Sequence, residues 1–194
     1  MDVVAQLYER IALWVVLVLS LSVHEWAHAL VASRLGDDTA RLGGRLTLSP
    51  LAHLDWLGSV VLPLLGVPFG WARPVPVEPL RFRAEHSMVG GLLQTALAGP
   101  VSNLCLAAIC AVAAGLGPSP GGPVAALLGM AVRVNLALAV LNLLPVPPLD
   151  GSRVLDGLMP ARLRPAWDRL TALGPAPMIA LGLAAYLLWR QLAP

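Results

Sequence analysis

The chain has 194 residues, of which 57% are hydrophobic and only 12% are charged, and its mean hydropathy is +0.75. Such a composition indicates an integral membrane protein and excludes an ordinary soluble domain. The 18 glycines and 18 prolines predict helices that are interrupted and closely packed. The formal net charge of +2 comes from 13 arginines that form no basic stripe, so we expect no nucleic-acid partner.

Apolar stretches of about 17–25 residues are long enough to cross the hydrocarbon core of a bilayer. Four stretches meet this requirement, over about 9–33, 88–116, 124–146 and 174–192. They predict an all-α polytopic membrane protein with about four transmembrane helices.

The first predicted span contains an H-E-x-x-H motif, His24-Glu25-Trp26-Ala27-His28. On a helix, residues four apart lie on one face with Cβ atoms about 5–6 Å apart, so the two imidazoles can bind one Zn²⁺. Glu25 is the residue type that can accept a proton from a water activated by the ion. Because ionisable groups in an apolar run are costly and rarely retained without a role, the motif predicts a metal site inside the membrane.

The region between the first two spans, about 39–83, is expected to lie at or near the membrane surface. A pair of glycines and partial polar–apolar alternation over 39–50 favour a short β-hairpin. Residues 57–70 are apolar but short and rich in Pro and Gly, which favours a re-entrant segment over a full crossing. Pro74, Pro76 and Pro79 predict extended backbone within 71–83.

The distribution of arginine gives an expected topology. If 57–70 is re-entrant, ten of the 13 arginines lie on one side of the membrane: Arg34, Arg41, Arg45, Arg73, Arg81, Arg83, Arg153, Arg162, Arg164 and Arg169. Arg10 and Arg190 lie on the other side, and Arg133 within the third span has no explanation. By the positive-inside rule the crowded side is cytoplasmic and both termini are outside. A segment 57–70 that crosses the membrane would divide the arginines almost evenly.

A catalytic zinc ion usually takes three protein ligands, and the motif supplies two. His53, His86 and acidic residues at membrane depth are the candidates for the third. Asp150 follows three prolines, at positions 145, 147 and 148, which cannot all continue a helix. The third span must therefore unwind, which can turn the carboxylate toward a polar cavity. The alternative is a loop aspartate that caps the next helix, and spacing alone leaves both readings open.

Three motifs together resemble the site-2 protease family of intramembrane zinc metalloproteases: HEWAH (24–28), AGPVSN (98–103) and NLLPVPPLDG (142–151). Two further segments, SPLAHLDWLG (49–58) and FGWARPVPV (69–77), look like small bacterial members of that family. The resemblance covers roughly 15–160. It implies a single membrane-embedded metalloprotease domain over 1–194, with one Zn²⁺ bound by His24, His28 and Asp150 and a water activated by Glu25.

The resemblance also implies the reaction and its setting. The expected substrate is a membrane protein whose peptide bonds are hydrolysed in or near a transmembrane segment. The expected location is the cytoplasmic membrane of a prokaryote, with the active site toward the cytoplasm, and the 194 residues leave no room for the PDZ-like or nucleotide-sensing domains of longer relatives. The alternatives are a zinc-binding transporter or a non-catalytic scaffold. Glu25 distinguishes a protease from a transporter, because hydrolysis needs this carboxylate and transport does not.

Asn142, Asn103 and His53 are secondary candidates for substrate binding or oxyanion stabilisation. An amide in an apolar span normally finds a hydrogen-bond partner, which is the simpler role for both asparagines. The family's matching Asn-x-x-P segment favours the functional role for Asn142. His53 is expected to be a surface or hydrogen-bonded imidazole unless it lies near the site, and Asn135 is expected to be structural. Gly99-Pro100 is expected to permit close helix packing without a chemical role.

Overall fold

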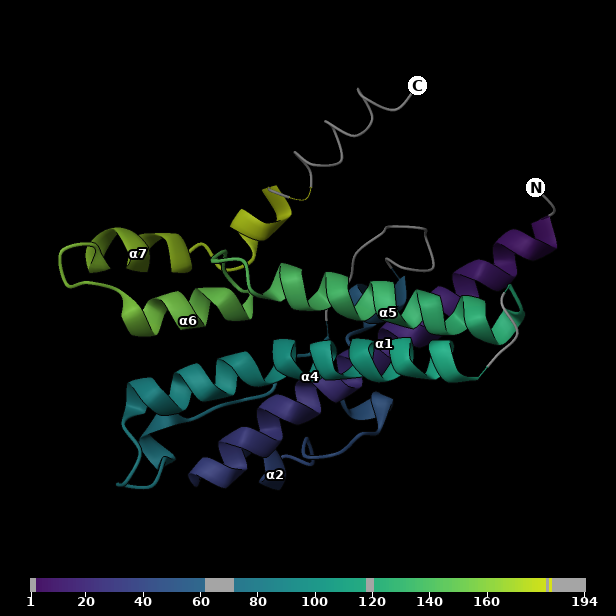
Figure 1. The fold of residues 1–194 in the computed structure, drawn as a ribbon. Coiled ribbons are helices and arrows are strands. Elements are labelled where there is room, and N and C mark those ends of the chain that lie inside the picture. The colour runs from purple at the N-terminus through teal and green to yellow at the C-terminus, as the bar shows by residue number, and fades with distance from the viewer. Residues whose placement is uncertain (1–2, 62–71, 118–120, 181, 183–194) are drawn as a thin grey trace.

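The computed structural model describes residues 3–61, 72–117, 121–180 and 182. Three long helices dominate these parts of the chain: α1 (Val3–Leu35), α4 (Met88–Leu116) and α5 (Pro123–Asn142). All three are long and apolar enough to cross a membrane by length and composition. They pack against one another, with α4 running opposite to α1 and α5 (Figure 1). The prediction of an all-α membrane protein is confirmed in these parts of the chain.

The helix bounds agree with the first three predicted spans, except that α1 begins at Val3 rather than at about 9 and that the third span ends earlier. Ser87 caps α4, since its Oγ accepts a hydrogen bond from the Gly90 N–H at 3.0 Å. Helix α5 ends at Asn142 rather than at 146, because the prolines that follow cannot continue it. The fourth predicted span, 174–192, lies largely outside the described residues, so the count of four is not confirmed.

Shorter helical elements connect and flank the long helices. They are α2 (Thr39–Leu42), the 3₁₀ turns η1 (Pro50–Ala52) and η3 (Pro79–Arg81), the π-helical η2 (Trp56–Val61), α6 (Asp150–Leu158) and α7 (Arg164–Thr171). Helices α6 and α7 lie beside each other at one end of the bundle (Figure 1). A hydrogen-bonded ion pair joins them, with Arg164 Nη1 2.6 Å from Asp156 Oδ1.

The β-hairpin predicted over 39–50 does not form; α2 and irregular backbone occupy these residues instead. The physical reason lies at Asp37, whose Oδ1 accepts hydrogen bonds from the backbone N–H of Thr39 at 3.0 Å and from its hydroxyl at 2.5 Å. Such a side-chain bond to a nearby N–H favours a helical turn over strand pairing. Gly44 has a φ of +68° and follows the end of this turn. The glycine pair therefore terminates a helix and does not close a hairpin.

The rest of the 39–83 region agrees in part with expectation. Residues 57–61 belong to η2, and 62–71 lie outside the described residues, so the choice between a re-entrant and a crossing segment stays a prediction. Residues 72–78 contain no helix or strand, as Pro74 and Pro76 predict. The prediction is wrong at Pro79, which begins the 3₁₀ turn η3, because proline is favourable at the first position of a helix. This extended segment is attached to the loop before η2, because the Arg73 N–H donates to the His53 carbonyl at 2.8 Å.

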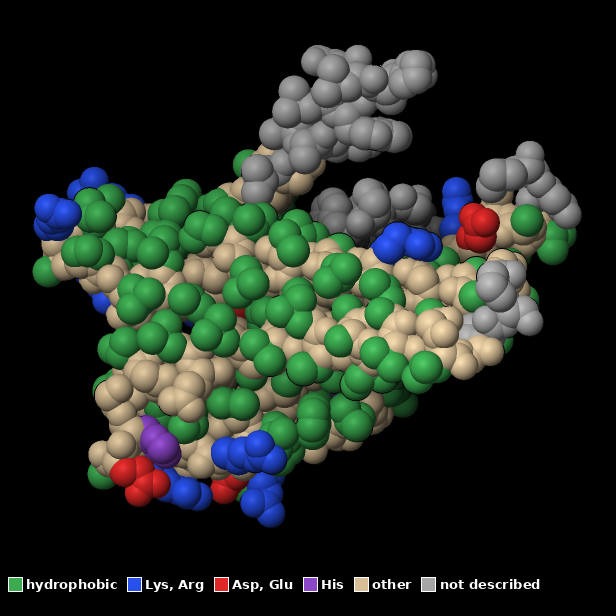
Figure 2. Space-filling view, in the orientation of Figure 1, with side chains coloured by type: hydrophobic (Ala, Val, Ile, Leu, Met, Phe, Trp, Pro, Cys, Tyr) green, Lys and Arg blue, Asp and Glu red, His purple; other side chains and the backbone are tan. Residues whose placement is uncertain are grey.

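The interior of the three-helix bundle combines apolar side chains with a buried polar group, and its outer surface is apolar. Large side chains such as Leu19, Ile109 and Val140 are more than half exposed. Figure 2 shows hydrophobic side chains spread over the outer faces of the long helices. The side chains of Asn103 and Asn135, by contrast, are buried between the helices. This arrangement suits a hydrocarbon surrounding, and it buries His24 and His28 inside the protein, whereas Arg133 on α5 is exposed.

Candidate metal centre and active site

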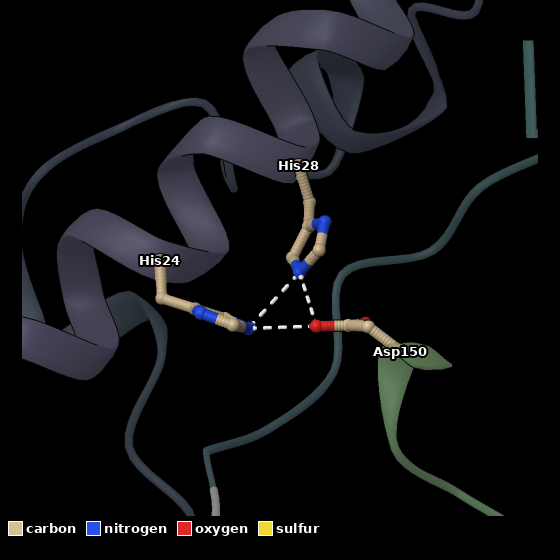
Figure 3. Close-up of side chains that lie close together, drawn as sticks. All are labelled: His24, His28 and Asp150. Atoms are coloured by element: carbon tan, nitrogen blue, oxygen red, sulfur yellow. Dashed lines mark hydrogen bonds and ion pairs between the residues drawn. The ribbon is translucent and has the colours of Figure 1, made fainter. Parts of the chain in front are cut away.

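Three predicted ligands meet in the polar interior: His24, His28 and Asp150 (Figure 3). Asp150 Oδ2 lies 3.0 Å from His24 Nε2 and 3.2 Å from His28 Nε2, and the two imidazole nitrogens are 3.0 Å apart. All three residues are buried. The two histidines lie one turn apart on α1, and Asp150 is the first residue of α6. The structure thus brings together two segments that are more than a hundred residues apart in the chain.

Asp150 reaches the histidines because the chain turns back on itself after α5. A Cβ on Gly151 would overlap the carbonyl oxygen of Leu143 and would lie 2.5 Å from that of Leu144. Only glycine permits this close approach of the turn to the end of α5. The Ser152 hydroxyl closes the turn by donating to the Leu149 carbonyl at 2.6 Å. The capping reading of Asp150 is wrong, since the N-cap of α6 is Leu149 and no side-chain hydrogen bond caps this helix. The Asp150 carboxylate faces the imidazoles instead.

Both imidazoles are oriented through their Nδ1 atoms. His28 Nδ1 lies 2.6 Å from the carbonyl oxygen of Thr95, and His24 Nδ1 lies 2.6 Å from Asn103 Oδ1. These oxygens can only accept, so each Nδ1 carries a hydrogen and donates it. In the neutral imidazole, Nε2 then keeps a free lone pair. Hydrogen bonding of this kind to the second ring nitrogen is the usual arrangement at metal-binding histidines.

The donor set fits a zinc ion. Asp150 Oδ2 is buried and has no hydrogen-bond donor. Two imidazole lone pairs and a carboxylate oxygen thus converge within about 3 Å, which is repulsive unless a cation lies among them. Two histidines and one carboxylate are a known ligand set for catalytic Zn²⁺.

Gly99 of α4 leaves room for an ion at this point. A Cβ at this position would lie 2.5 Å from His24 Cε1 and 2.6 Å from His24 Nε2, and it would overlap His28 Nε2. Any larger residue would therefore displace the ligand nitrogens. The sequence predicted close packing at Gly99-Pro100 without a chemical role. The structure gives Gly99 the more specific role of keeping open the space where the ligands meet.

Glu25 lies beside the extended segment 72–78. Its Oε2 accepts a hydrogen bond from the Val75 N–H at 3.0 Å. Pro74 and Pro76 have no N–H, so Val75 is the only residue of this triplet that can donate. This contact was not predicted from the sequence, although the proline on each side of Val75 was an available signal.

Two buried charged side chains hold the extended segment in place. Arg45 Nη2 donates to the carbonyls of Arg73 and Pro74 at 3.3 and 3.2 Å. Farther along, Asp37 Oδ2 accepts from the Glu78 N–H at 2.6 Å. The bonds lie on either side of Val75, so they fix the position of the N–H that contacts Glu25. Neither Arg45 nor Asp37 was a sequence-based candidate, because their partners are backbone groups more than 25 residues away.

The chain is similar to known peptidases. A model of Peptidase family M50 matches residues 117–185. The candidate zinc metalloprotease YwhC of Bacillus subtilis is 39% identical over 189 residues, which cover 92% of this chain and 84% of that protein. The chain belongs to Peptidase family M50. The predicted resemblance to the site-2 protease family is thereby confirmed.

Other M50 relatives are longer. The candidate zinc metalloprotease Rip2 of Mycobacterium tuberculosis is 35% identical over 188 residues, which cover 95% of this chain and 66% of that protein. Rip2 of Mycolicibacterium smegmatis is 32% identical over 162 residues, and the match covers 59% of its length. No solved structure matches the chain significantly.

Of the secondary candidates in this M50 chain, Asn103 reaches the site, as the partner of His24. Asn142 Nδ2 donates to the Leu138 carbonyl of its own helix at 2.9 Å. His53 is buried and pairs through Nε2 with the Thr47 carbonyl at 2.8 Å. No hydrogen bond described for Asn142 or His53 connects it to the three ligands, so a role in substrate or oxyanion binding remains untested for them.

Proposed function

We propose that this M50 peptidase is an intramembrane zinc metalloprotease that hydrolyses peptide bonds in or near the transmembrane segments of membrane proteins. The observation that carries the proposal is the convergence of His24, His28 and Asp150 in the buried interior of three membrane-length helices. The relatives named as zinc metalloproteases support the choice of metal and reaction. The depth of the candidate ligands supports membrane proteins as the substrate class, because the peptide bond to be cleaved must enter the membrane region to reach these residues.

His24, His28 and Asp150 would hold the ion through the three atoms that converge in the structure. When bound, Zn²⁺ supplies Lewis acidity, which polarises the scissile carbonyl and lowers the pKa of the attacking water. Glu25 follows His24 directly on α1 and accepts the proton of that water. It then returns the proton to the nitrogen of the leaving amine, as a general base that becomes a general acid.

The hydrogen bond from Val75 gives Glu25 a defined orientation for these transfers. The N–H contacts Oε2, and the other carboxylate oxygen is left to face the water. Since Arg45 and Asp37 hold the flanking backbone, the orientation is set before a substrate binds. Such preorganisation is worth more than a contact that forms only during the reaction.

A groove of about 540 Å³ supports a path for the substrate. One wall is formed by Val75 and Val77 of the extended segment, and the other by Pro148 and Ser152 near Asp150. The groove therefore borders both the partner of Glu25 and the turn that carries the third ligand. A helical substrate hides its carbonyls, so we expect the substrate to unwind locally and to lie in this groove as an extended peptide.

The site is proposed to face the cytoplasmic side of a bacterial membrane. His24 and His28 lie in the half of α1 that ends at Leu35, near the turn that begins α6. Figure 2 shows basic side chains beside α6 and α7 and a second group near α2, while others lie toward the end of the bundle where the N-terminus is marked. An excess of arginine next to membrane spans is typical of the cytoplasmic face.

The test of the proposed function uses the full chain in proteoliposomes with single-span membrane proteins as substrates. Glu25→Gln should retain bound zinc and lose cleavage by about 10²–10⁴-fold, which is the usual contribution of a general base. Glu85→Gln, at an exposed glutamate away from the ligands, is the matched control and should cleave normally. Cleavage by Glu25→Gln at the wild-type rate would refute the assignment of Glu25 as the base. Zinc binding without cleavage by the wild-type protein would favour the transporter or scaffold alternatives.

A further inference from the structure

A line of buried polar side chains crosses the bundle and ends on His24. It runs from Asn135 on α5 to Asn103 on α4 and then to His24 on α1. The side chain of Asn103 is 0% exposed and that of Asn135 is 2% exposed. Buried amides between apolar helices need hydrogen-bond partners. Here the orientation of each side chain determines the orientation of the next one in the line.

The orientation of the Asn135 amide is fixed by the backbone. Its Nδ2 donates to the Ala131 carbonyl at 2.9 Å and to the Ser20 hydroxyl at 2.9 Å. A backbone carbonyl can only accept, so rotating the amide by 180° would bring two acceptors together. Oδ1 of Asn135 must therefore point toward Asn103.

The orientation of Asn103 follows from that of Asn135. Asn103 Nδ2 donates to Asn135 Oδ1 at 2.8 Å and lies 3.5 Å from the Ser20 carbonyl. The reverse orientation would place Oδ1 of Asn103 against two acceptors. Oδ1 therefore faces His24 Nδ1, at 2.6 Å, and this nitrogen must carry the hydrogen.

We propose that Asn135 is a positioning residue that acts through Asn103 to hold His24 in the tautomer with a free lone pair on Nε2. This nitrogen is the one that faces Asp150. His28 obtains the same tautomer directly from the Thr95 carbonyl, so the two candidate ligands are prepared by different means. The proposal rests on the proposed zinc function, and it assigns to α5 a part in preparing a ligand on α1.

The tautomer can be measured without metal or substrate. The chain has four histidines, so ¹⁵N-histidine labelling of the metal-free protein in detergent gives few signals, and His53→Gln and His86→Gln assist their assignment. At a pH at which the imidazoles are neutral, we expect His24 of the wild-type protein to carry its hydrogen on Nδ1. A hydrogen on Nε2 in the wild-type protein would overturn the proposal, whatever the variants do.

Substitutions then test the role of Asn135. Asn135→Leu should release the Asn103 amide and give His24 a mixture of tautomers, while His28 is unchanged. Ser20→Ala is the matched control, because Asn135 stays bound to the Ala131 carbonyl and His24 should keep its wild-type signal. A wild-type His24 signal in folded Asn135→Leu would contradict the proposal.

Zinc affinity, measured by competition with a chelator, links the tautomer to the site. Asn135→Leu should bind Zn²⁺ about 10–100-fold more weakly, the usual cost of losing an outer partner of a metal-binding histidine. If the wild-type protein has the expected tautomer but binds no zinc, the proposed function is refuted and the positioning role of Asn135 is not. If Asn135→Leu binds zinc with wild-type affinity and cleaves normally, the positioning role of Asn135 is refuted and the proposed function is not.

Discussion

The two halves of the candidate metal centre are built by opposite means. The half on α1 is local, since two histidines four residues apart share one face of an uninterrupted helix. The half at the α5–α6 turn depends on three prolines that end a helix and on a glycine that lets the turn pack against Leu143. The first half needs only helical periodicity, whereas the second needs tertiary contacts. Substitutions that affect one half without the other can separate their contributions.

The largest effect is expected where both halves meet, at Gly99. Gly99→Ala places a methyl group among the ligand nitrogens, so zinc binding and cleavage should both fall below detection, a greater loss than the 10–100-fold typical of outer partners. Gly115→Ala is the matched control on the same helix, because a Cβ there has no neighbour within 4 Å. Zinc titration and cleavage assays measure the effect, and normal zinc binding by Gly99→Ala would disprove the proposed position of the ion.

A smaller effect is expected when only the half at the α5–α6 turn is disturbed. Gly151→Ala forces the turn away from the Leu143 carbonyl and shifts Asp150, while the α1 helix stays intact. Zinc affinity should fall by about 10–100-fold, as for other losses of ligand orientation. Gly157→Ala, also on α6, is the control, since its Cβ would meet only side chains at 3.4 Å or more. Equal zinc affinities for the two variants would mean that Asp150 is not a ligand.

The smallest effect is expected from a change that leaves both halves intact and removes the partner of Glu25. Val75→Pro removes the N–H that contacts Oε2, so cleavage should slow by about 10-fold, part of what a general base contributes, at unchanged zinc content. Val75→Ala keeps the N–H and should cleave close to the wild-type rate. The steady-state kcat is measured for both variants. Equal values of kcat would show that the Val75 contact does not orient the base.

The local half of the site could be predicted from the sequence, and so could the three long helices. Helical spacing places His24 and His28 together, and apolar length defines α1, α4 and α5 without knowledge of their neighbours. The prolines before Asp150 predicted that the third span would unwind before this residue, and α5 ends at Asn142. The family resemblance was needed to prefer Asp150 as a ligand, because spacing cannot show which way an unwound segment turns.

Other features depend on contacts that a sequence pattern does not contain. The glycine pair near Gly44 was consistent with a hairpin, and only the hydrogen bonds from Thr39 to Asp37 favour a helical turn. Gly99 and Asn103 matter through atoms of α1, far away in the chain. The same holds for Val75, whose partner is Glu25. The sequence predicted packing at Gly99 and hydrogen bonding or substrate binding at Asn103, and it predicted no role for Val75. The contacts with His24, His28 and Glu25 follow only from the distances.

The central claim is that one zinc ion is bound by the two imidazoles of α1 and the carboxylate at the start of α6. X-ray absorption at the zinc edge of the purified, zinc-loaded protein tests it most directly. We predict one ion per chain, with two imidazoles and oxygen ligands around it, and a weakened site in Asp150→Asn that keeps both imidazoles. Sulfur ligands, fewer than two imidazoles, or a spectrum and affinity unchanged by Asp150→Asn would contradict the claim.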